Sequence, residues 1–172
     1  MKGFSLVEVL IAMALIATTA VGLADLFLLS SRVAHESRVD SAATATAQSK
    51  MAQLRGLTWA YDAAGAGTAV ADTTTDLSVD PPGAGGAGLS FSPAGSLTSS
   101  VGGYVDYVNG DGRYAGRGTA PPPAAVYLRR WSIQPLPGDA AHSLVLQVMA
   151  TRVTRPRARE VHLVSILTRT AR

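Results

Sequence analysis

Glu8 is the residue whose chemistry fits its surroundings least. It is the one charged side chain between Phe4 and Ala24, a stretch of 21 residues. A helix rises about 1.5 Å per residue, so this stretch matches the roughly 30 Å hydrocarbon core of a bilayer. An ionised carboxylate at that depth costs about 3 kcal/mol, so Glu8 needs a charge partner. The nearest candidate is the α-amino group that a cut just before Phe4 would create.

The residues from Gly3 to Ala12, GFSLVEVLIA, resemble the processing and assembly signature of type IV pilins and of the pseudopilins of type II secretion. The resemblance implies that a prepilin peptidase cuts between Gly3 and Phe4 and that the new amino group of Phe4 is methylated. It also implies that Glu8 is the docking acid between subunits. On this basis we expect a structural subunit, a minor pilin or a pseudopilin, of a type IV pilus or a type II secretion pseudopilus.

The same resemblance implies where the chain works and with what. We expect a single-pass protein of the inner (cytoplasmic) membrane with its head on the extracytoplasmic side, later incorporated into a pilus or pseudopilus. The expected partners are other pilin or pseudopilin subunits, the prepilin peptidase and the inner-membrane assembly platform. Many major pilins carry a proline in the anchor half, whereas no proline precedes Pro81 here, which favours a minor subunit or a pseudopilin.

Two alternatives explain the apolar stretch without assembly. A secretory signal peptide has an apolar core of about 7–15 residues followed by a small-residue cleavage site. The stretch here is longer, and its acid lies near its start. An ordinary membrane anchor fits the length, but it gives no reason for Glu8.

The charge distribution suggests a second function. Residues 58–111 carry six aspartates and no basic side chain, whereas residues 112–172 have a net charge of +8. A cluster of four arginines falls at one turn: Arg152, Arg155, Arg157 and Arg159. Phosphate contacts from such a patch would make the chain a filament-tip adaptor that binds DNA for natural transformation. The alternatives are a solvated turn, or a surface for the acidic middle segment of a neighbouring subunit.

Metal binding and catalysis have little support. Asp106, Asn109 and Asp111 resemble part of a calcium loop, but Tyr107 and Gly118 stand where that loop needs acids. The alternative is a turn, because Asn-Gly and Asp-Gly are strong turn dipeptides. The three histidines show no metal-type spacing, and the absence of cysteine excludes thiolate chemistry. We therefore predict no enzyme activity, no cofactor and no resident metal.

The elements that must position these residues are predicted from hydrophobic periodicity. Apolar residues recur every three or four positions after the anchor, at Val39, Ala43, Ala47, Met51, Leu54 and Leu57. This pattern predicts a helix continuous with the anchor, from residue 4 to residue 57, with Gly56 as its stop signal. Alternating apolar residues over 126–134, 144–153 and 161–167 predict three antiparallel strands, with Tyr127 and Trp131 in the core.

The predicted fold class is α+β and pilin-like: a long N-terminal helix, membrane-spanning in its first half, packed on a small C-terminal antiparallel sheet. The residues between helix and sheet are rich in Gly, Ala, Ser and Thr, which indicates loops. The predicted parts are a leader (1–3), a transmembrane or filament-core half-helix (4–29), an amphipathic half-helix (30–57), a Gly/Ala-rich loop region (58–112) and a sheet head (113–172).

Overall fold

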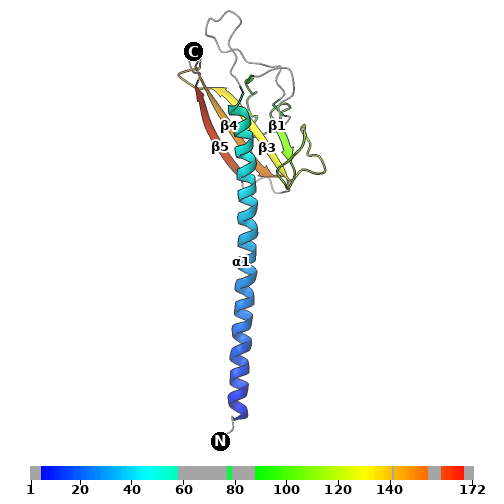
Figure 1. Cartoon of the computed structure of the whole chain (residues 1–172), viewed down its shortest axis with the longest axis vertical. Coiled ribbons are helices and arrows are strands. Elements are labelled where there is room, and N and C mark those ends of the chain that lie inside the picture. Colours follow the sequence, from blue (N-terminus) through cyan, green and yellow to red (C-terminus); the bar gives the residue numbers. More distant parts are fainter. Residues whose placement is uncertain (1–4, 58–76, 79–87, 141, 155–159, 169–172) are drawn as a thin grey trace, which may run out of the picture. The chain divides into compact units, whose positions relative to one another are not determined.

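One helix of 50 residues, α1 (Leu6–Arg55), forms the first part of the computed structural model (Figure 1). The structure describes residues 5–57, 77–78, 88–140, 142–154 and 160–168. The helix agrees with the predicted one to within two residues at each end. At its end the N–H of Gly56 donates to the carbonyl oxygens of Ala52 and Gln53. The helix ends at Arg55, directly before the predicted stop signal Gly56.

The chain divides into two units, residues 1–39 and residues 40–172. In the first unit the helix exposes its apolar side chains, with Leu6 77% and Phe27 75% exposed. Within the described residues, α1 is the one helix long and apolar enough to cross a membrane, judged by length and composition. None of the described residues of this unit, 5–39, is buried, so its apolar surface requires lipid or other chains to cover it.

The second unit contains an antiparallel sheet with the strand order β2-β1-β3-β4-β5. Its strands are β1 (Val105–Val108), β2 (Tyr114–Arg117), β3 (Tyr127–Pro135), β4 (Ser143–Arg152) and β5 (Glu160–Thr168). The predicted meander of three strands corresponds to β3, β4 and β5, and the α+β fold class is confirmed. The strand β1 lies inside the range 58–112 that was assigned to loops. All four of its residues are buried, so its sequence lacks the alternation that marks a half-exposed strand.

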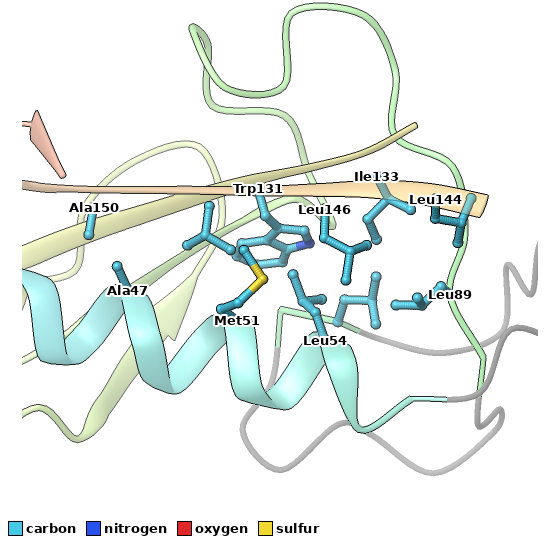
Figure 2. Close-up of a cluster of buried hydrophobic side chains, with 11 residues drawn as sticks. Ala47, Met51, Leu54, Leu89, Trp131, Ile133, Leu144, Leu146 and Ala150 are labelled. Atoms are coloured by element: carbon cyan, nitrogen blue, oxygen red, sulfur yellow. The ribbon is translucent and has the colours of Figure 1, made fainter. Parts of the chain in front are cut away.

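The core of the second unit lies between the sheet and the last four turns of α1. Figure 2 shows Met51 and Leu54 of the helix directed toward Trp131 and Leu146 of the sheet. The predicted helix stripe is buried from Ala43 to Leu54, and the predicted core residues Tyr127 and Trp131 are also buried. This packing fixes which face of α1 meets the sheet.

The first half of β3 pairs with β1, and a loop segment covers the edge of its second half. Ser92 donates its N–H to the carbonyl of Ile133, and its Oγ accepts the N–H of Ile133 at 3.0 Å. The N–H of Trp131 donates to the carbonyl of Tyr104. These contacts satisfy backbone groups that an uncovered sheet edge would leave without partners.

Candidate assembly site at the start of the helix

Ser5 and Glu8 form a cap at the first turn of α1. The backbone N–H of Ser5 donates to Oε2 of Glu8 at 3.0 Å, and the N–H of Val7 donates to Oγ of Ser5 at 3.4 Å. The contact from Ser5 to Glu8 is that of a capping box, in which the residue at N3 accepts the N–H of the N-cap residue, whereas Oγ of Ser5 accepts from Val7 at N2. Glu8 therefore has a defined place at the positive end of the helix.

The cap lies on a strongly apolar surface. Glu8 is exposed, and its neighbours Leu6, Val7 and Val9 are large apolar side chains that are also exposed. Gly3 and Phe4, the residues predicted for cleavage and methylation, lie outside the described residues. The arrangement offers one carboxylate on a surface that would lose its water on helix-to-helix contact, where a cation would be bound strongly.

The prediction from the sequence did not include Ser5. The signal was present, because S-x-x-E before an apolar run is the sequence form of a capping box. Glu8 belongs both to this capping pattern and to the apolar stretch, where it fits the pattern of an intramembrane acid. The assembly signature drew attention to Glu8 alone.

A second polar cluster is buried in the head. Asp106 on β1 accepts from Nε of Arg129 at 2.7 Å and from its Nη2 at 2.8 Å. Nζ of Lys50 on α1 donates to Oδ2 of the same carboxylate at 3.0 Å and also to the carbonyl of Leu77. The ammonium group also lies 3.8 Å from the ring centroid of Trp131. The three charged side chains are at most 1% exposed, so this cluster joins the helix to two strands.

Asp106 is also one of the three calcium candidates, with Asn109 and Asp111. Both oxygens of Asp106 are held by the cationic side chains of Lys50 and Arg129. Oδ1 of Asn109 accepts the N–H groups of Asp111 and Arg113, at 3.0 and 2.9 Å. These contacts form the turn between β1 and β2, as the alternative interpretation predicted. No group of three or more His, Cys, Asp or Glu side chains within the described residues could hold a metal ion.

The arginines of the DNA hypothesis are only partly described. Arg152 is half-buried at the end of β4, opposite Tyr127 in the sheet register. Arg155, Arg157 and Arg159 lie outside the described residues. DNA binding by this cluster therefore stays a prediction.

The described histidines of the head have local carboxylate partners. Nδ1 of His142 lies 2.9 Å from Oδ1 of Asp139, and Nε2 of His162 lies 3.2 Å from Oε2 of Glu160. Both pairs are well exposed. The hydrogen bond from Ser143, and then that from His142, hold the pKa of Asp139 below its ordinary value.

Comparison with known proteins gives a family match for the N-terminal segment of the chain. Residues 1–24 match the family description "Prokaryotic N-terminal methylation motif". Searches of curated proteins and of solved structures found no match. The matched segment contains the cap at Ser5 and Glu8 and the beginning of the long apolar helix. The chain thus carries, on a long N-terminal helix, the methylation motif that is the signature of type IV pilins and pseudopilins.

Proposed function

We propose that the chain is a structural subunit, a minor pilin or a pseudopilin, of a type IV pilus or a type II secretion pseudopilus. The observation that carries this proposal is the methylation motif at residues 1–24, with Glu8 at the start of a 50-residue helix. Prepilin peptidase removes residues 1–3 by cutting between Gly3 and Phe4. The new amino group of Phe4 is then methylated.

Assembly follows from the exposed surface of the first unit. The apolar side chains between Leu6 and Val33 are mostly more than half exposed, which is costly in water. In the inner membrane, lipid covers them, and the head lies on the extracytoplasmic side. In the filament, the same helices of neighbouring subunits cover them. Transfer between these two environments keeps the apolar surface away from water throughout.

Glu8 supplies the specific contact in this transfer. Its carboxylate pairs with the amino group of Phe4 from an adjacent subunit, in surroundings from which water is excluded. Removing one partner of such a pair costs about 3–5 kcal/mol, because the other charge is left buried and alone. The assembly platform of the inner membrane therefore receives subunits whose docking acid is ready for a neighbour.

The test replaces Glu8 with alanine in cells that contain the whole assembly machinery. The variant should lose its leader, measured by intact mass, and should be absent from the sheared filament fraction. Asp25→Ala is the matched control, because Asp25 is a second exposed acid on the same helix, and it should be incorporated normally. Full incorporation of Glu8→Ala would overturn the proposed function.

A further inference from the structure

The contact between Ser5 and Glu8 does not depend on processing. The donating N–H belongs to the peptide bond between Phe4 and Ser5, whereas the proposed cut breaks the bond between Gly3 and Phe4. The same hydrogen bond can therefore exist in the precursor and in the mature chain. Only the nitrogen of Phe4 changes, from a peptide amide in the precursor to an amine in the mature chain.

We propose that the backbone N–H of Ser5 is a positioning group that holds Glu8 ready for docking before a neighbour arrives. This inference rests on the proposed function. In the described part of the chain the contact uses Oε2 of Glu8, and Oε1 makes no hydrogen bond. One carboxylate oxygen is thus fixed by its own helix, and the other is presented to the amino group of an adjacent subunit.

The physical reason is the cost of ordering a long side chain. Glutamate has one of the largest rotamer entropies of the side chains, and a contact made in advance removes part of the ordering cost from docking. The contact also gives the carboxylate a donor in an apolar environment, where a polar group without a partner is costly. Glu8 is thereby held in one place while the subunit waits in the membrane.

A backbone donor has a distinctive pattern of tolerated substitutions. Every residue except proline provides an N–H, so the side chain at position 5 is replaceable as long as proline is avoided. The hydroxyl of Ser5 makes only the longer contact, 3.4 Å from the N–H of Val7. A role carried by the hydroxyl would show the opposite pattern, with Ser5→Ala as damaging as Ser5→Pro.

The first experiment measures incorporation of full-length variants into sheared filaments. Ser5→Ala and Ser5→Thr should be incorporated within about twofold of the wild type. Ser5→Pro, cleaved as shown by its mass, should fall at least about tenfold, which corresponds to 1.4 kcal/mol. Normal incorporation of cleaved Ser5→Pro, while Glu8→Ala fails, would overturn the inference and leave the proposed function standing. Normal incorporation of Glu8→Ala would overturn both.

The second experiment observes the contact itself and needs no cleavage. In the full-length chain in detergent micelles, the amide proton of Ser5 is followed by NMR exchange and chemical shift. Glu8→Gln retains an acceptor and should leave this amide protected, whereas Glu8→Ala should expose it and raise its exchange rate at least about tenfold. If the exchange rate of the Ser5 amide proton were unchanged in Glu8→Ala, the inference would be overturned. This result decides the question even if Ser5→Pro proves not to be cleaved in the first experiment.

Discussion

Lys50 on α1 places its Nζ atom 3.0 Å from Oδ2 of Asp106 on β1, and both side chains are fully buried. The two residues are 56 positions apart in the chain. Arg129 on β3 donates to both oxygens of the same carboxylate, from Nε to Oδ1 and from Nη2 to Oδ2. One buried anion thus connects the helix with two strands, and it fixes both the rotation of α1 and its position along the sheet.

Asp106 and Lys50 should differ in how much the stability of the fold depends on them. Asp106→Asn leaves two buried cations without their anion and should cost about 3–5 kcal/mol of the free energy of unfolding. Lys50→Met leaves the pair of Asp106 and Arg129 intact and should cost about 1–3 kcal/mol. Urea unfolding of the detergent-solubilised chain, followed by Trp131 fluorescence in a Trp59→Phe background, measures both values.

The ranking is the decisive result of that experiment. If Lys50→Met lowered stability as much as Asp106→Asn, the central role of the carboxylate would be wrong. The double variant Lys50→Met with Asp106→Asn should cost less than the sum of the two single changes, because the side chains are in direct contact.

The apolar contact between helix and sheet can be tested by truncation. Leu54 is fully buried in the cluster that contains Trp131 and Leu146. Leu54→Ala should lower the free energy of unfolding by about 2–5 kcal/mol, because it removes apolar contacts and leaves a cavity. Val164→Ala is the matched control: Val164 is 65% exposed on β5, so the change should stay within about 0.5 kcal/mol. Equal losses in the two variants would contradict the position of the core.

The long elements could be predicted from the sequence because each repeats one pattern over many residues. The apolar stripe from Ala43 to Leu54 predicted the helix face, and the alternation around Trp131 predicted β3. The strands β1 and β2 have four residues each, too few for a period to be recognised. Their positions depend on pairing with β3, which is not a local property of the sequence.

The polar cluster of Lys50, Asp106 and Arg129 could not be predicted from the sequence, because it also depends on strand pairing. Lys50 falls on the buried helix face, and Arg129 alternates with Trp131 on the core side of β3, so both were signals of buried charge. Their shared partner depends on the antiparallel register that places Asp106 opposite Arg129. The cap at the start of the helix involves only four consecutive residues, so the pattern S-x-x-E alone could have predicted the cap at Ser5.

The turn between β1 and β2 should depend on Asn109 and not on calcium. Its Oδ1 accepts two backbone N–H groups, so Asn109→Ala should lower the free energy of unfolding by about 1–2 kcal/mol. Asp111 contributes only its backbone to these contacts, so Asp111→Ala is the control and should change little. The melting temperature of the wild type should stay constant on addition of millimolar calcium, and a rise with calcium that Asp111→Ala abolishes would contradict this reading of the turn.

The turn between β3 and β4 should respond to acid through Asp139. Oγ of Ser143 donates to Oδ2 of Asp139 at 2.6 Å, and this bond is the first cause of the lowered pKa. Because the pKa of Asp139 is lower in the folded state, its ionised form stabilises the fold at pH values above the ordinary pKa of aspartate. This stabilisation is lost as the pH falls through the lowered pKa. Ser143→Ala should raise the pKa of Asp139 more than His142→Ala does, measured by carboxyl-carbon NMR. The reverse order would contradict the assignment.

Processing should depend on the small residue before the cut. A prepilin peptidase that accepts Gly3 has to bring the backbone between Gly3 and Phe4 close to its catalytic groups, and a leucine side chain at position 3 would obstruct that approach. Gly3→Leu should therefore accumulate in the membrane as the uncut chain, with the mass of residues 1–172. Gly22→Leu is the control, because among the described residues a Cβ at Gly22 would meet nothing within 4 Å beyond the local helix backbone, and the site is far from the cut in the sequence. Normal loss of the leader in Gly3→Leu would place the cleavage elsewhere and remove the amino group of Phe4 as the partner of Glu8.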